Sequence, residues 1–322
     1  MKAKTNLTML CDFYELTMAN GYFQTGLKDR ICYFDVFYRS VPDKGGFSIA
    51  AGLAQVVEYI QGLSFDEEDV AYLRGKGCFS EEFLQYLLHF EFTGDIWAVP
   101  EGTPVFPKEP MVVVRAPAIE AQLLETFALL TVNHQSLIAT KANRIVRAAK
   151  GHAVMEFGSR RAQGSAAAID GARAAYIAGC CGTACTISDQ LYGTPALGTM
   201  AHAWVQMFDS ELDAFRAYCQ TYPDNATLLV DTYNSLQSGV PNAIRAFNEV
   251  LRPKGITVTA VCPGPMKTEF FDAVGDHDLF GNIPWCDPVR VVAGTIRAAK
   301  KGRTFYTPTA FNKFYRFVAK IL

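Results

Sequence analysis

Side chains that could bind or transform a small molecule follow four apolar runs of the sequence. They lie at residues 157–161, at residues 183–185, at His202 and at Asp231. An aromatic ring can stack on a flat ligand, a guanidinium can hold a carboxylate through two parallel hydrogen bonds, and an imidazole can carry a proton or accept a phosphoryl group. Because loops at the carboxyl ends of parallel strands converge on one mouth, this spacing predicts a single small-molecule site.

The runs that must position these residues alternate with helix-like segments. Strand-like runs lie at residues 153–158, 178–183, 196–203 and 226–232, after a long helical stretch that spans residues 118–150. Repeated strand and helix units predict a parallel sheet, open or closed into a barrel. Ahead of them, strand-like runs at residues 32–39, 95–99 and 111–116 mix with short helical patterns. That mixture predicts an α+β domain at the N-terminus.

Composition indicates a cytoplasmic protein that acts on small molecules. The chain has 322 residues, half of them hydrophobic, and a formal charge of -2, so it has no basic excess that would draw it to nucleic acid or membrane. Its nine cysteines show no C-x-x-C spacing, which argues against a zinc site and a disulfide framework. The apolar stretch near the N-terminus ends at Asp12, too early for a signal peptide.

The order of short strings from residue 12 to residue 254 closely resembles nicotinate phosphoribosyltransferases. The strings are DFYELTMANGYF, FDVFYRSVP, GGFSIAAGL, VPEGTPVFPKEP, ATKANRI, MEFGSRRAQG, GTMAHAW and VDTYNSL. The resemblance implies a type II phosphoribosyltransferase barrel and a reaction of NAD salvage. In that reaction nicotinate and phosphoribosyl pyrophosphate give nicotinate mononucleotide and pyrophosphate, driven by ATP through a phosphohistidine. It further implies Mg²⁺ on the pyrophosphate and a homodimer.

The resemblance also implies the residues that hold the pyridine ring. Phe157 corresponds to the stacking ring and Arg160 to the partner of the carboxylate, with Ser159 and Arg161 beside them. By itself an adjacent Arg pair is more often solvated surface, but here the pair directly follows a buried-looking strand. Tyr14 resembles a second stacking ring that reaches the partner subunit's pocket, although a Tyr at helical spacing from apolar neighbours is more often a packing residue.

His202 corresponds to the residue that ATP phosphorylates in the family. Taken alone, a histidine among Met, Ala and Trp is usually a satisfied core residue. We expect Asp231, at the end of the next strand, to hold the imidazole in one tautomer, an inference from strand adjacency. Its alternative role, a cap for a helix at residues 237–250, is weak because Asp231 lies several residues too early. Thr183 completes the expected substrate contacts, while Ala184 and Cys185 stand where the family has Ser and Asn.

The last 68 residues have a different pattern. Residues 256–271 and 287–303 resemble the C-terminal segment of short-chain dehydrogenases, but the Gly-rich nucleotide turn of that family is missing. We therefore expect three domains, at residues 1–117, 118–254 and 255–322, with an incomplete barrel in the middle and low stability. The alternative to an active enzyme is an inactive fusion that keeps part of the nicotinate and ATP site.

Two helices are expected in this tail. Asp287 and Pro288 predict a helix start, and Val289, Val292, Ile296 and Ala299 predict its apolar face. A second apolar stripe, formed by Phe311, Phe314, Val318 and Ile321, is expected to pack on the rest of the chain, with a membrane-surface helix as the alternative.

Overall fold

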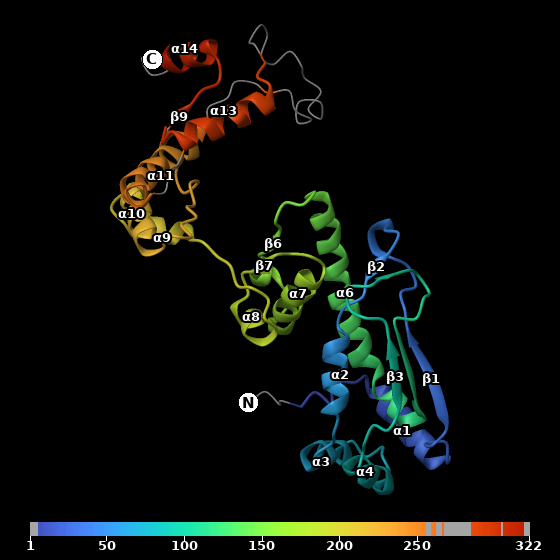
Figure 1. Ribbon diagram of the computed structural model, residues 1–322. Helices are drawn as coiled ribbons and strands as arrows, with labels where there is room; N and C mark the ends of the chain where they lie inside the picture. The colour runs from blue at the N-terminus through green and yellow to red at the C-terminus, as the bar shows by residue number, and fades with distance from the viewer. Residues whose placement is uncertain (1–5, 256–258, 262–265, 267–284, 304, 319–322) are drawn as a thin grey trace. The chain divides into compact units, whose positions relative to one another are not determined.

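The computed structural model describes residues 6–255, 259–261, 266, 285–303 and 305–318. The chain divides into two compact units, Met1–Gly198 and Thr199–Leu322. Figure 1 shows the first unit in blue to yellow-green and the second in yellow to red. The expected division into three domains stays a prediction.

A small antiparallel sheet forms the base of the first unit. Its strand order is β1 (Ile31–Val36), β5 (Val112–Pro117) and β3 (Asp95–Ala98), with Phe34 opposite Val114. Helices α1 (Phe13–Gln24), α2 (Leu53–Gln61), α3 (Glu67–Gly75) and α4 (Glu81–Leu88) accompany it, and a short ladder joins β2 (Ser48–Ile49) to β4 (Pro104–Val105). Large side chains of the sheet and helices share one core, which includes Phe83, Leu87 and Ile119. The expected α+β domain is confirmed.

A long helix connects this domain to the parallel strands. After the short helix α5 (Ala118–Gln122), α6 runs from Glu125 to Ala148, as the helical stretch predicted. The helix binds β2 and the residues just after it, because Thr140 Oγ1 accepts from Ile49 N at 2.8 Å and Ser136 Oγ accepts from Ala51 N at 3.0 Å. Helix α6 also packs against α2 and against α7 (Ser165–Ile177), which lies beside it in Figure 1. The parallel strands are therefore fixed to the α+β domain through α6.

Three short parallel segments follow α6. Strand β6 (Met155–Glu156) pairs with β7 (Gly182–Thr183), and Thr183 pairs in turn with Ala196. Helix α7 connects β6 to β7, and α8 (Thr186–Tyr192) follows β7. This is the expected alternation of parallel strands and helices, and it gives the chain a mixed α/β fold.

The second unit begins with a small helical cluster. Helices α9 (His202–Gln206), α10 (Glu211–Thr221) and α11 (Val240–Ala246) surround a core that includes Val205, Phe215 and Ala246. Ser210 caps α10 by accepting from Asp213 N at 3.1 Å. Segments of π-helix, at Ser235–Gly239 and Phe247–Leu251, flank α11.

A β-α-β arrangement and one further helix complete the second unit. Strand β8 (Ala260–Val261) lies parallel to β9 (Phe305–Tyr306), and α13 (Pro288–Lys300) lies between them in the sequence. Asp287 caps α13 by accepting from Val289 N and Arg290 N, so the predicted helix start is confirmed. Helix α14 spans Ala310–Val318, and Phe314 on it is exposed. Ile321 lies outside the described residues.

Two of the four expected strands are absent from the described residues. The run at residues 196–203 keeps only the bridge at Ala196, and His202 begins helix α9 instead of ending a strand. The run at residues 226–232 is not a strand, and its apolar side chains Ala226, Leu228 and Val230 pack on the helical core. A strand needs a neighbour for its backbone hydrogen bonds, and no neighbouring strand pairs with this run in the described structure.

Candidate functional site

The carboxylate of Glu156 organises the end of β6. Its Oε2 atom accepts from Thr183 Oγ1 at 2.6 Å, and its Oε1 atom accepts from the backbone N–H of Gly158. The backbone oxygen of Glu156 accepts from Ala184 N at 2.9 Å. One residue therefore connects the loop after β6 to the end of β7 (Gly182–Thr183). The sequence offered one signal for it, a charged residue inside an apolar run.

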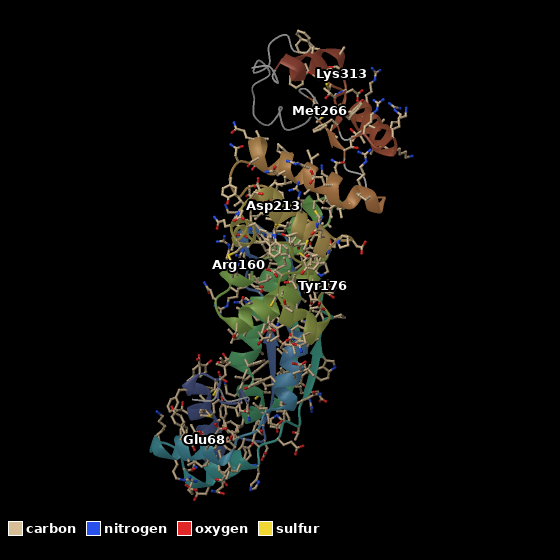
Figure 2. All side chains as sticks on the ribbon, turned by 90° about the vertical axis from the view of Figure 1, so that its left-hand side faces the viewer. Glu68, Arg160, Tyr176, Asp213, Met266 and Lys313 are labelled. Carbon is tan, nitrogen blue, oxygen red and sulfur yellow. The ribbon has the colours of Figure 1, made fainter. Side chains whose placement is uncertain are left out.

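The expected pyridine-binding residues lie on the loop that Glu156 holds. Phe157 is 49% exposed, and a single 3-10 turn spans Ser159–Arg161, closed by a 2.8 Å bond from Arg161 N to Gly158 O. Arg160 and Arg161 are exposed, and Figure 2 labels Arg160. The Ser159 hydroxyl is buried and has no hydrogen-bond partner among the described residues. The structure thus brings an aromatic ring and two guanidinium groups together on one short loop.

Thr183, one of the expected substrate contacts, lies at the end of β7 (Gly182–Thr183). Its side chain is fully buried. The hydroxyl donates to Glu156 and accepts from Cys185 N at 3.0 Å. Cys185 is buried as well, while Ala184 is exposed. In this arrangement Thr183 supports the loop, and a direct contact with substrate stays a prediction.

His202 lies at the first position of helix α9 in the second unit. Its side chain is exposed, and Nδ1 lies 3.2 Å from Thr232 Oγ1. The residue that contacts the imidazole is Thr232, which sequence reasoning missed although it neighbours the expected Asp231. Asp231 is exposed, and its role as the orienting carboxylate stays a prediction.

Tyr14 lies at the start of α1 (Phe13–Gln24), and the residue is 44% exposed. Its hydroxyl donates to Glu125 Oε1 at 2.7 Å. This hydrogen bond, with smaller contributions from burial and nearby acidic groups, raises the pKa of Tyr14 to about 12. The hydroxyl is thus bound within its own chain, while one part of the ring remains open to solvent.

A buried polar network secures α7 (Ser165–Ile177), the helix that follows the pyridine loop. Arg173 binds both carboxylate oxygens of Glu101, which also accepts from the backbone N–H groups of Gly52 and Leu53. Burial would raise the pKa of Glu101, but the bonds from Arg173 and the two N–H groups outweigh it, so this pKa lies below its usual range. Sequence reasoning missed this pair, because its members lie 72 residues apart.

A separate cavity of about 300 Å³ lies between the sheet and α6. Its lining is apolar apart from Tyr38 and Asn133, and the Tyr38 hydroxyl donates to Asn133 O at 3.2 Å. No charged side chain lines it. The cavity therefore lacks a partner for an anionic ligand and is distinct from the loop that carries Arg160.

Comparison with solved structures first defines the class of fold. The chain is similar to the nicotinate-nucleotide pyrophosphorylase from Pyrococcus furiosus, with a TM-score of 0.59, 22% identity, and coverage of 95% of this chain and 68% of that one. It is also similar to human nicotinic acid phosphoribosyltransferase, with a TM-score of 0.70, 27% identity, and coverage of 79% and 61%. The chain is thus a mixed α/β protein with the fold of these enzymes.

Sequence comparison then identifies the relatives. Residues 9–133 match the nicotinate phosphoribosyltransferase (NAPRTase) N-terminal domain. The chain is 49% identical over 236 residues to nicotinate phosphoribosyltransferase pncB2 of Mycobacterium tuberculosis, covering 73% of this chain and 50% of the relative. It is 41% identical over 244 residues to the Bacillus subtilis nicotinate phosphoribosyltransferase, covering 76% and 50%. Over about three quarters of its length, the chain is therefore similar to proteins named nicotinate phosphoribosyltransferase.

Three further findings accompany this comparison. The chain spans about half the length of the curated relatives it matches. The comparisons support no relationship to short-chain dehydrogenases for the last 68 residues. Within the described part of the chain, no helix has the length and apolar character needed to cross a membrane.

Proposed function

We propose that the chain acts in NAD salvage as a nicotinate phosphoribosyltransferase. The reaction forms nicotinate mononucleotide and pyrophosphate from nicotinate and phosphoribosyl pyrophosphate, with hydrolysis of ATP. The observation that carries the proposal is the 49% identity over 236 residues with an enzyme of that name. The geometry of the loop after β6 supports it, since an exposed ring and exposed guanidinium groups suit a flat anion.

The pyridine ring of nicotinate stacks on Phe157 in this proposal, and Arg160 binds its carboxylate. Both side chains are exposed, and the described residues give Arg160 no ion pair, so the guanidinium is available for a ligand. Two parallel N–H bonds to a carboxylate fix the ring in its plane as well as attracting its charge. Ser159 and Arg161 complete the loop. Its role is to hold the nucleophilic ring nitrogen in line with the anomeric carbon of the ribose.

His202 is the proposed acceptor of the phosphoryl group of ATP. The hydrogen bond to Thr232 engages Nδ1 and leaves Nε2 as the ring nitrogen that attacks phosphorus. His202 lies in the second unit, whereas Phe157 and Arg160 lie in the first. That all three serve one cavity is a prediction of the proposed function.

The expected Mg²⁺ would neutralise charge on the pyrophosphate. Within the described residues, no three His, Cys, Asp or Glu side chains come together as a ligand set. Mg²⁺ commonly keeps several waters and binds substrate phosphates instead of a cage of protein ligands, so the residues present fit an ion that arrives with phosphoribosyl pyrophosphate. The protein's own contribution in this proposal is to position the pyridine ring and the ribose.

A homodimer and a cytoplasmic location belong to the same proposal. Tyr14 would offer its exposed ring edge to the partner's pyridine loop while Glu125 holds its hydroxyl. The eight described cysteines are free thiols, which suits a reducing compartment.

The incomplete barrel and the dehydrogenase-like tail remain predictions. The parallel pairing of β8 (Ala260–Val261) with β9 (Phe305–Tyr306) supports a β-α-β unit in the tail.

The test is formation of nicotinate mononucleotide from nicotinate, phosphoribosyl pyrophosphate, ATP and Mg²⁺ by the full chain. Turnover that Arg160→Ala abolishes would support the proposal. The control is Arg30→Ala, which removes another exposed guanidinium far from the loop in sequence. Nicotinate binding without turnover would favour an inactive remnant of the enzyme. The absence of both nicotinate binding and turnover would refute the proposal.

A further inference from the structure

We infer that Glu156 is the positioning residue of the pyridine loop. Its carboxylate makes one bond on each side of the site, to the N–H of Gly158 and to the hydroxyl of Thr183. The inference rests on the proposed function, because it assigns Glu156 a role in placing nicotinate. Glu156 is not itself expected to touch the substrate.

The first bond, from the Gly158 N–H to the Glu156 carboxylate, fixes the start of the loop. Gly158 is the residue after Phe157 and the first residue before the 3-10 turn of Ser159–Arg161. Because the Gly158 N–H is held from β6 (Met155–Glu156), the loop turns back on its own strand within two residues. This constraint sets the direction in which Phe157 leaves the strand. It also sets the position from which Arg160 reaches a ligand.

The second bond ties the loop to the neighbouring strand. Thr183 is fully buried, and its hydroxyl can donate only once, to Glu156 Oε2. The same hydroxyl accepts from Cys185 N, so the carboxylate, the hydroxyl and the N–H form a chain that crosses from β6 to β7. A charged acceptor makes these bonds stronger than bonds between neutral groups. The loop is therefore held by strand pairing and by this chain together.

The absence of a side chain at Gly158 leaves the space that the Glu156 carboxylate occupies. A Cβ atom at residue 158 would lie 2.6 Å from Glu156 Oε1, closer than any real contact of that kind. Residue 158 has a backbone φ of -88°, which any residue adopts, so backbone strain does not require glycine there. The space that a side chain at residue 158 would need is taken by the carboxylate. A methyl group would displace a flexible side-chain end without disturbing the strand.

The experiment compares four variants of the full chain. Glu156→Ala removes the carboxylate, Gly158→Ala displaces it, and Thr183→Val removes the hydroxyl while keeping the branched shape. Thr183→Ser keeps the hydroxyl and is the matched control. Two quantities are measured for each: hydrogen exchange of the peptide that contains residues 155–162, and the affinity for nicotinate by calorimetry. Far-ultraviolet circular dichroism of each variant reports whether the chain still folds.

We expect the first three variants to exchange faster at residues 155–162 and to bind nicotinate about tenfold or more weakly. Their circular dichroism should be unchanged, and Thr183→Ser should behave as the unmodified chain. Faster exchange with nicotinate affinity unchanged would overturn the inference, as would unchanged exchange in Glu156→Ala. If the unmodified chain fails to bind nicotinate, the proposed function fails, and the exchange data still decide whether Glu156 holds the loop. If Glu156→Ala fails to fold, Gly158→Ala and Thr183→Val decide.

Discussion

The guanidinium of Arg173 donates two hydrogen bonds to the carboxylate of Glu101, Nη1–Oε1 at 2.9 Å and Nη2–Oε2 at 2.5 Å. The side chains of the two residues are only 16% and 18% exposed. Because Glu101 Oε1 also accepts from Gly52 N at 2.7 Å, the pair joins helix α7 (Ser165–Ile177) to the start of α2 (Leu53–Gln61). It therefore anchors the helix that follows the pyridine loop on the α+β domain.

Removing Arg173 should strongly destabilise the first unit. Arg173→Met leaves the Glu101 carboxylate buried with an uncompensated charge, and breaking a pair of this kind costs about 3–5 kcal/mol. The matched control is Arg74→Met, which breaks the Arg74–Glu81 pair, whose side chains are 45% and 55% exposed. Because both side chains of that pair are exposed to water, that change should destabilise the chain much less. Urea denaturation followed by circular dichroism gives both values, and equal costs would show that burial of the Arg173 pair contributes little.

The same pair should make stability depend on pH in one direction. The pKa of Glu101 is lowered in the folded chain, so its contribution is complete above the unfolded pKa of about 4.3 and is lost as the pH falls through the folded value. The difference in free energy of unfolding between the unmodified chain and Glu101→Gln should therefore be constant from about pH 7 to pH 5 and shrink below about pH 4. A difference that grows as the pH falls would mean that burial, not Arg173, dominates this pKa.

Thr232 should control the phosphorylation of His202 if the proposed function holds. Without the Thr232 hydroxyl, Nδ1 loses its 3.2 Å partner and the ring can rotate or change tautomer. We expect Thr232→Val to lower acid-labile labelling by ATP about three- to tenfold, the loss of one hydrogen bond. Thr232→Ser should retain the labelling, and His202→Ala should abolish it. Asp231→Asn serves as a further comparison, since a larger loss there than in Thr232→Val would restore Asp231 as the orienting residue.

The proposed homodimer can be tested by mixing two inactive variants. Tyr14→Ala and Arg160→Ala each damage every site of their own dimers. In a mixed dimer, one site combines an intact Arg160 with an intact Tyr14 of the other subunit. Random mixing should therefore restore about a quarter of the unmodified activity. Activity that stays near zero after mixing would show that Tyr14 serves its own chain.

Local patterns predicted the elements whose interactions are close in sequence. The runs at residues 32–39, 95–99 and 111–116 became β1, β3 and β5, and the stretch at residues 118–150 became α5 and α6. The site loop at residues 157–161 was also placed correctly after a strand. The strands predicted to end at His202 and to span residues 226–232 were wrong. An apolar run has the same sequence pattern whether it pairs as a strand or packs against helices. Glu156, Thr232 and the Glu101–Arg173 pair depend on partners distant in sequence, which no local pattern reveals.

Helix α13 (Pro288–Lys300) allows this difference between pattern and packing to be measured. The expected apolar face holds Val289, Val292 and Ile296, yet these side chains are 76%, 57% and 51% exposed. The buried face instead holds Val291, which is 4% exposed, and Gly294, where a Cβ atom would collide with the Tyr306 ring. The face that packs is therefore rotated away from the apolar stripe, because β9 (Phe305–Tyr306) covers the small residues.

The same substitution at two adjacent positions tests this rotation. Val291→Thr places a hydroxyl in a buried site and should cost about 1–3 kcal/mol, whereas Val292→Thr places it in water and should cost less than about 0.5 kcal/mol. The helix propensities of the two variants are identical, so the difference isolates burial. Hydrogen exchange of the α13 amides should accordingly accelerate about 5- to 150-fold in Val291→Thr alone. If Val292→Thr accelerates exchange more, the apolar stripe is the packed face and the arrangement of α13 against β9 is wrong.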